Sequence, residues 1–126
     1  MKDPTRKPTD GELGILRVLW SRGPSTVRQV AEALGREAGY TTVLKLLQIM
    51  TEKRLVVRDE AERTHVYEAA YTQDQTQRQL VTDLLDRVFD GSAAQLVLQA
   101  LATNKTSPEE LDEIRKLLAT KSGGSR

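Results

Sequence analysis

The sequence lacks cysteine altogether and contains a single histidine, His65. The absence of cysteine excludes disulfides, thiolate catalysis, iron–sulfur clusters and cysteine-based zinc or copper sites. One histidine without a cluster of other ligands gives little support to a metal site. We therefore expect neither a metal nor a cofactor.

Long apolar runs are also missing, and no segment approaches the roughly 20 apolar residues that a membrane helix needs. The first ten residues, MKDPTRKPTD, have no apolar core of the kind found in signal peptides. We expect a soluble cytoplasmic protein with no membrane insertion.

An excess of charge of one sign is absent as well, because 19 basic residues face 18 acidic ones and the net charge is +1. This balance excludes a uniformly basic protein that coats nucleic acid. Residues 1–70 carry 12 basic and 10 acidic side chains, and residues 71–126 carry 7 and 8. Any affinity for DNA must therefore come from local placement of cations and from two copies acting together.

The arrangements typical of enzymes are not found either. The serines fall at expected helix caps, in loops or in the tail, and none stands in a nucleophile elbow. No glycine-rich loop could cradle a phosphate, and the acidic pairs Asp59–Glu60 and Glu109–Glu110 are better explained as a turn and a helix start. We expect no enzymatic activity and no catalytic residue.

Aromatic residues make up only 4% of the 126 residues, whereas leucine, alanine and the charged residues abound, which favours helices. A chain of this length fits one compact domain or a small domain with an appendage. A largely helical chain of this size often needs a partner chain to bury its leucines.

Two capping boxes mark the first two helices. Thr9–Glu12 begins a helix whose leucines recur at helical spacing, and Gly23-Pro24 stops it. Thr26–Gln29 begins a short helix that we expect to run to about Glu37.

A third helix is expected from Thr41 or Thr42, either of which could cap it, to about Lys53. The pattern then changes to two β segments, residues 55–58 and 63–68, around a polar link at residues 59–62. Three helices followed by a hairpin form the winged helix-turn-helix arrangement, in which the third helix enters the DNA major groove. The inner face of this helix is expected to consist of Val43, Leu46, Leu47 and Met50.

The outer face of the third helix is polar. Threonine and glutamine side chains bond base edges or phosphates, and lysine reaches phosphate or guanine. An equally good explanation is that these residues solvate the outer face of an amphipathic helix. The outward positions by helical spacing are Thr41, Thr42, Lys45, Gln48 and Glu52, with Ile49 at the border.

The hairpin carries Arg58, Arg63 and His65 near its ends. Two arginines beside a polar turn suit phosphate or minor-groove contact, although charges also keep a hairpin edge from pairing with other chains. Glu60 and Glu62 at the tip argue against deep insertion beside phosphates.

From residue 72 onward, the helix caps and the spacing of apolar residues predict three more helices, which begin at Thr72, Ala93 and Ser107. They carry more apolar positions than three helices without a partner can bury.

Seven segments form an ordered set along the chain: Leu13–Trp20, Pro24–Val30, Tyr40–Met50, Glu52–Val56, Thr64–Tyr67, Phe89–Ser92 and Leu96–Leu98. This set resembles the penicillinase-repressor family (BlaI/MecI/CopY-like regulators) over roughly residues 9–119. The Tyr40-Thr41-Thr42 start of the third helix is its most specific piece.

The resemblance implies a homodimeric winged-helix transcriptional repressor on a palindromic, double-stranded DNA operator. The family's recognition-helix positions fall on Thr41, Thr42, Lys45 and Gln48. From the residues themselves we further expect Lys45, Arg58 and Arg63 to anchor phosphates. The dimer interface would consist of Leu80, Leu84, Leu85, Leu96, Leu101, Ile114 and Leu117.

The expected fold class is therefore mainly α, a winged helix-turn-helix domain with a two-stranded wing plus a C-terminal three-helix dimerisation region. We expect a flexible arm at 1–8, a winged-helix DNA-binding domain at 9–71, a helical dimerisation domain at 72–119 and a disordered tail at 120–126.

Two departures from the family concern the inducing signal. In the antibiotic-responsive branch a membrane sensor leads to cutting of an Asn-Phe bond, but Gln99-Ala100 stands at that point here, so the partnership with an upstream sensor protease is left open. The copper-responsive branch uses cysteines, which this chain lacks. The signal that releases DNA therefore does not follow from the sequence.

Two other functions are compatible with the sequence. One is a winged-helix protein-interaction module without DNA-binding activity, which would use the apolar C-terminal helices. The other is a repressor gated directly by a small molecule, for which the sequence shows no dedicated polar cluster.

Overall fold

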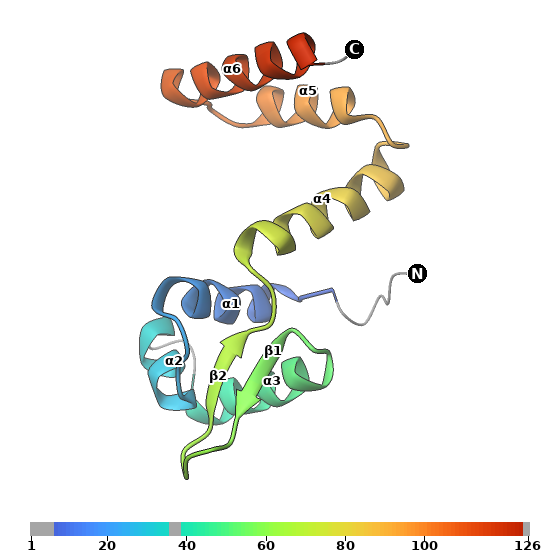
Figure 1. The fold of residues 1–126 in the computed structure, drawn as a ribbon. Helices are drawn as coiled ribbons and strands as arrows, with labels where there is room; N and C mark the ends of the chain where they lie inside the picture. Colours follow the sequence, from blue (N-terminus) through green and yellow to red (C-terminus); the bar gives the residue numbers. More distant parts are fainter. Residues whose placement is uncertain (1–6, 36–38, 125–126) are drawn as a thin grey trace. The chain divides into compact units, whose positions relative to one another are not determined.

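The computed structural model describes residues 7–35 and 39–124 (Figure 1). Its described part is mainly helical with one two-stranded antiparallel sheet, which confirms the predicted fold class. No helix in this part is long and apolar enough to cross a membrane. The elements are α1 (Asp10–Arg22), α2 (Val27–Leu34), α3 (Tyr40–Glu52), β1 (Val56–Asp59), β2 (Val66–Ala69), α4 (Gln73–Val88), α5 (Ala93–Thr103) and α6 (Pro108–Gly124).

The contacts within the chain define two compact units, with the boundary between Val81 and Thr82, inside α4. The predicted boundary lay ahead of this helix, after residue 71.

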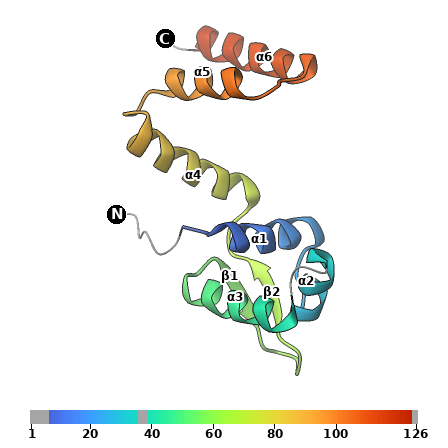
Figure 2. The ribbon, with the colours of Figure 1, turned by 180° about the vertical axis from the view of Figure 1, so that it is seen from behind.

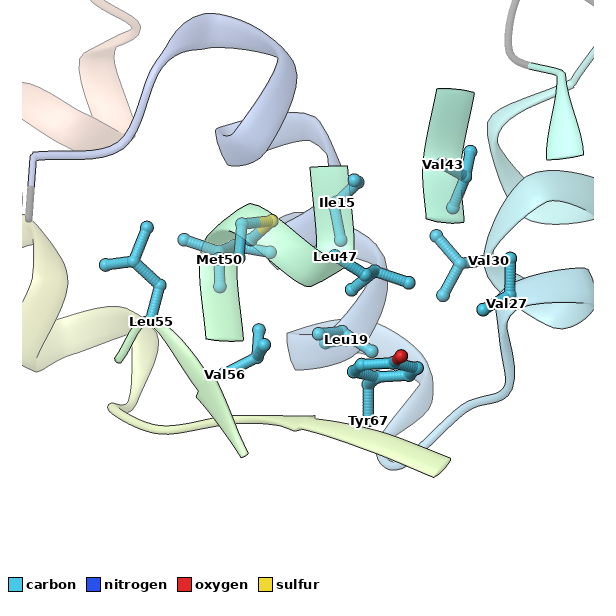
Figure 3. Packing of buried hydrophobic residues seen from close by; sticks show 11 residues of the cluster. Ile15, Leu19, Val27, Val30, Val43, Leu47, Met50, Leu55, Val56 and Tyr67 are labelled. Atoms are coloured by element: carbon cyan, nitrogen blue, oxygen red, sulfur yellow. The ribbon is translucent and has the colours of Figure 1, made fainter. Parts of the chain in front are cut away.

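The core of the first unit lies between α1, α2 and α3 on one side and the β-hairpin on the other (Figure 3). Each helix contributes one apolar stripe, as the spacing of its leucines and valines predicts. Removing one such side chain from water contributes about 1.5–3 kcal/mol. The buried apolar residues are Ile15, Leu16, Leu19, Val27, Val30, Val43, Leu47, Met50, Leu55, Val56 and Tyr67.

Strand β2 forms backbone hydrogen bonds along both of its edges. Its Tyr67 lies opposite Arg58 of β1 on one side. On the other side the Tyr67 and Ser25 backbones exchange two hydrogen bonds, of 2.9 and 2.8 Å. Ser25, in the turn between α1 and α2, is therefore joined to the sheet, which ties the helix-turn-helix to the wing.

The wing has a longer link than the sequence predicted. The strands end at the pair Asp59 and Val66, so residues 60–65 connect them rather than residues 59–62. Asp59 remains in the ladder while its side-chain Oδ1 accepts a hydrogen bond of 2.9 Å from the Ala61 N–H. This local bond starts the turn one residue later than the polar run suggests.

The predicted capping boxes of α1 and α2 are confirmed, with reciprocal bonds between Thr9 and Glu12 and between Thr26 and Gln29. Helix α2 ends earlier than expected, at Leu34, because Gly35 takes a φ of 87° and closes the helix. Of the stretch to Glu37 that we expected to be helical, residues 36 and 37 lie outside the described part.

The predicted cap of α3 was wrong. This helix begins at Tyr40 with Gly39 as its N-cap, so Thr41 and Thr42 lie within its first turn. The predicted end near Lys53 is confirmed, since Lys53 is the C-cap. A left-handed Arg54, with φ of 66°, then turns the chain toward β1.

The three later helices begin where the sequence predicted. Thr72, Ser92 and Ser107 each accept a hydrogen bond from a backbone N–H three residues on. Helix α6 continues to Gly124, beyond residue 119 where we expected the helical region to end, so the disordered tail predicted at 120–126 is wrong for residues 120–124. Residues 125–126 lie outside the described part.

In the second unit α5 and α6 lie side by side and are joined by residues 104–107, as both views show (Figures 1 and 2). None of the described side chains from residue 82 onward is fully buried. This unit thus lacks the closed core that the first unit has.

Candidate nucleic-acid interface

Helix α3 presents two faces of opposite character. Val43, Leu47 and Met50 are at most 1% exposed and hold the helix in the core. The outward positions predicted from helical spacing (Thr41, Thr42, Lys45, Gln48 and Glu52) are all exposed, and Ile49 is half-buried at the border. The polar row is therefore fixed in place by the apolar row behind it.

The N-terminus of α3 adds backbone donors to this face. Among the described residues no side chain caps the helix, since its N-cap is Gly39. The N–H groups of the first turn, around Thr41 and Thr42, point along the positive end of the helix dipole. Such a helix start binds a phosphate readily.

Lys45 lies one turn further along the exposed face. Among the described residues, no carboxylate forms an ion pair with it. Its ammonium group is therefore available to an external anion. Glu52, near the C-terminal end of the row, is the one acidic member of this face.

The wing holds its two arginines differently. Arg63 is exposed in the link and has no ion-pair partner in the described part of the chain. The side chain of Arg58 is 32% exposed, and its Nη2 lies 2.6 Å from Oε2 of Glu60. The Tyr67 hydroxyl and the Glu60 carboxylate, which both hydrogen-bond to the guanidinium, raise the pKa of Arg58 above its ordinary value. Arg58 is thus a charged group that already has an ion-pair partner. Arg63 has none among the described residues, so its guanidinium is available to an external anion.

Arg28 is an exposed cation that the sequence reasoning did not select. It lies in the first turn of α2, two residues after the N-cap Thr26. The helix that precedes the recognition helix crosses the DNA backbone in helix-turn-helix proteins, so a cation in the first turn of this helix was the signal that the sequence offered.

The seven residues predicted for a dimer interface all lie in α4, α5 and α6. Leu84 is 41% exposed, Leu101 37% and Leu117 57%, whereas Leu80, Leu85, Leu96 and Ile114 are half-buried. Further exposed apolar side chains in these helices, which the prediction did not include, are Val81, Val88, Val97, Leu98 and Leu118.

The described residues contain no group of three histidine, aspartate or glutamate side chains that could hold a metal ion. His65 is exposed in the link of the wing. The residues gathered on α3 and the wing can offer hydrogen bonds and positive charge.

Comparison with known proteins shows to which family this chain belongs. Residues 8–120 match the family model described as penicillinase repressor. The transcriptional regulator BlaI of Mycobacterium tuberculosis, in strains CDC 1551 and H37Rv, is 35% identical over 118 residues, which cover 91% of this chain and 85% of the relative.

Among solved structures, a homodimeric winged helix-turn-helix DNA-binding domain from Mycobacterium bovis, a possible ArsR-family transcriptional regulator, is 25% identical with a TM-score of 0.47. The alignment covers 68% of this chain and 77% of that one. The family model and the BlaI relative both describe regulators of transcription and not enzymes, as the sequence predicted. Because the family model spans nearly the whole chain, this protein belongs to the penicillinase repressor family of transcriptional regulators.

Proposed function

We propose that the protein is a sequence-specific DNA-binding repressor that acts as a homodimer on a palindromic operator. The observation that carries this proposal is the exposed polar row of α3, which is fixed by a fully buried apolar row on the same helix. A polar face that only solvates a helix does not require uncapped backbone N–H groups at the helix N-terminus. A recognition helix uses such N–H groups to bind phosphate.

Each side chain of the row has a role suited to its chemistry. Thr41, Thr42 and Gln48 would bond base edges in the major groove, and a threonine methyl also fits a thymine methyl. Lys45 would bind a phosphate or a guanine, and Arg63 and Arg58 would bind phosphates beside the groove. The two subunits would place their α3 helices in successive major grooves, one in each half-site.

The apolar side chains of α4, α5 and α6 support the dimer. Leu84, Val88, Leu98 and Leu118 remain exposed in one chain, at 41–65% of their surface. A second copy would cover such surface, and closed two-fold pairing is the commonest way in which a single chain does so. Two copies also double the phosphate contacts, which offsets the net charge of only +1.

The position of Gln99-Ala100 bears on the inducing signal. Both residues are exposed and lie inside α5, which is helical from Ala93 to Thr103. Proteases cut preferentially at exposed loop tips, so a sensor protease acting at this pair would first have to unfold α5 locally.

The proposed function is tested by selecting genomic DNA fragments that the full-length protein retains and measuring their affinity by gel shift at two salt concentrations. Lys45→Ala should weaken binding and lower the salt slope by about 1.8 for two subunits, because each loses one phosphate contact. Thr42→Ala should instead relax the sequence preference at one position in each half-site.

Lys105→Ala is the matched control, because Lys105 is an exposed lysine in the link between α5 and α6. It should leave both affinity and slope unchanged. Binding that depends on neither salt nor operator sequence would contradict the proposed function. If both α3 variants bound like the wild type, the contacts would have to come from another surface.

A further inference from the structure

Arg58 occupies an unusual place for a residue that contacts DNA. It lies directly opposite Tyr67 in the hairpin, and Tyr67 is only 1% exposed. Side chains alternate across a strand, so Arg58 shares the core-facing side of β1 with the buried Val56. Helix α3 packs against this same strand. The guanidinium therefore emerges at the edge of the core, on the side of the wing where α3 lies.

The guanidinium is only partly satisfied there. Its Nη2 pairs with Oε2 of Glu60 at 2.6 Å, and the Tyr67 hydroxyl also hydrogen-bonds to the guanidinium, while its buried Nε has no hydrogen-bond partner among the described residues. Guanidinium binds carboxylate or phosphate best through two parallel N–H donors. The pair with Glu60 uses only one of the two donors on this edge, so it lacks the added strength of a two-donor pair.

The position of Glu60 allows its side chain to move away from Arg58. Its side chain is 54% exposed, and it is the first residue of the link between the strands. An exposed ion pair contributes little, because water solvates both charges and the side chains lose entropy when they are held together. Separating the two groups is therefore a small step.

We propose that Glu60 is an intramolecular competitor of DNA for Arg58. In the free protein the carboxylate holds the guanidinium, and in the complex a backbone phosphate takes the place of the carboxylate. This inference rests on the proposed function, and it assigns Glu60 a role opposed to binding. Glu60 thereby sets how strongly the wing holds phosphate.

The expected size of the effect follows from the strength of exposed ion pairs. Releasing Arg58 from Glu60 should tighten binding by roughly 1.4- to 5-fold for each subunit. A dimer that engages both wings would show about the square of this factor.

The test measures fluorescence anisotropy of a labelled random-sequence duplex of about 30 base pairs, because phosphate contacts do not depend on sequence. Full-length wild type, Glu60→Gln and Glu62→Gln are compared over a salt series. Glu62 is the matched control, since it is an exposed glutamate in the same link with no ion-pair partner among the described residues. Both variants remove one negative charge near the DNA, but only Glu60→Gln removes the ion-pair partner of Arg58.

The comparison is repeated in an Arg58→Gln background. The competition predicts that Glu60→Gln tightens binding more than Glu62→Gln, and that this excess disappears without Arg58. It also predicts that Arg58→Gln lowers the salt slope by about 0.9 for each subunit, which a merely structural role would not do. The comparison of the two glutamate variants leaves Arg58 in place, so it stays informative if Arg58→Gln does not fold.

Equal effects of the two glutamate variants would overturn the competition while leaving DNA binding intact. An excess that persists without Arg58 would overturn it as well. If the wild type bound no duplex even at about 50 mM salt, where electrostatic binding is strong, the proposed function itself would be contradicted.

Discussion

At the scale of single residues, Glu12 joins two distant parts of the first unit. Its Oε1 accepts the Thr9 backbone N–H at 2.9 Å and so completes the capping box of α1. The same carboxylate lies 2.8 and 3.1 Å from Nζ of Lys53, at the end of α3. Glu12 is 2% exposed and Lys53 19%. One side chain thereby fixes the C-terminal end of α3 to the start of α1.

Removing either partner of this pair should destabilise the fold unequally. Lys53→Met leaves the more deeply buried charge without its partner, and we expect a loss of about 2–4 kcal/mol in the free energy of unfolding. Glu12→Gln leaves Lys53, which can turn toward water, while the amide oxygen keeps the Thr9 bond; we expect about 1–2 kcal/mol. Urea unfolding at one protein concentration measures both changes.

The double variant should cost much less than the sum of the single variants, because the pair is already broken by the first change. Lys116→Met provides the control, since Lys116 pairs with Asp112 on the surface of α6, where the two side chains are 69% and 58% exposed. This change should cost less than about 0.5 kcal/mol. Additive effects at Glu12 and Lys53 would show that the pair is not coupled.

Residue-level features differ in how far the sequence reveals them. The exposed row of α3, from Thr41 to Gln48, follows from helical spacing alone, because the period of 3.6 residues separates the two faces. The pair of Glu12 and Lys53 does not, since it joins residues that only the packing of α1 on α3 brings together. The ion pair of Glu60 and Arg58 depends on the register of the hairpin, which was predicted incorrectly from the sequence.

At the scale of elements, boundaries were predictable where a side chain makes them. Thr9, Thr26 and Thr72 cap their helices through bonds to the residue three positions on, and all three starts follow from that spacing. Where the backbone makes the boundary, prediction was less accurate. Gly39 begins α3 without a side-chain hydrogen bond from the described part of the chain, and Gly35 ends α2 through its own backbone conformation.

The turn from α1 to α2 depends on backbone conformation in the same way. Gly23 has φ of 90° and ψ of −166°, a region that side chains with a Cβ hardly enter, and its N–H bonds to Leu19 O at 2.8 Å. We expect Gly23→Ala to destabilise the protein by about 1–3 kcal/mol, although a Cβ there would meet no atom of the described residues within 4 Å. Thermal and urea unfolding measure the change.

Gly11→Ala is the control for this substitution. Gly11 lies within α1, and an added Cβ would make an ordinary contact of 3.7 Å with Leu46. Alanine favours helix over glycine by roughly 0.5–1 kcal/mol, so this variant should be the more stable one. If both substitutions destabilised the protein alike, the conformation of Gly23 would not be the cause.

At the scale of the whole molecule, the two units differ in how completely one chain can bury its apolar residues. The first unit closes a core around Ile15, Leu47 and Tyr67, which are at most 1% exposed. In α4, α5 and α6 the apolar side chains of the second unit stay half-buried or exposed. The sequence indicated that these helices have more apolar residues than one chain can bury, because such residues occur on more than one side of a helix. It could not show which of these residues one chain leaves exposed.

The proposed dimer leads to a prediction that can be tested without disturbing the fold of the single chain. Leu84 is already 41% exposed in one chain, so Leu84→Glu buries no charge within the chain and should leave helix content unchanged by circular dichroism. In a dimer the same glutamate would be desolvated opposite apolar side chains, so the mass measured by light scattering should fall from twice the 14.1 kDa of one chain toward the monomer mass.

Val57→Glu is the control, since Val57 is a 56% exposed residue of the wing, and this variant should keep the dimer mass. A Leu84→Glu protein that stays dimeric would place the interface elsewhere, whereas a monomer with weakened DNA binding would tie operator affinity to the pairing of two α3 helices.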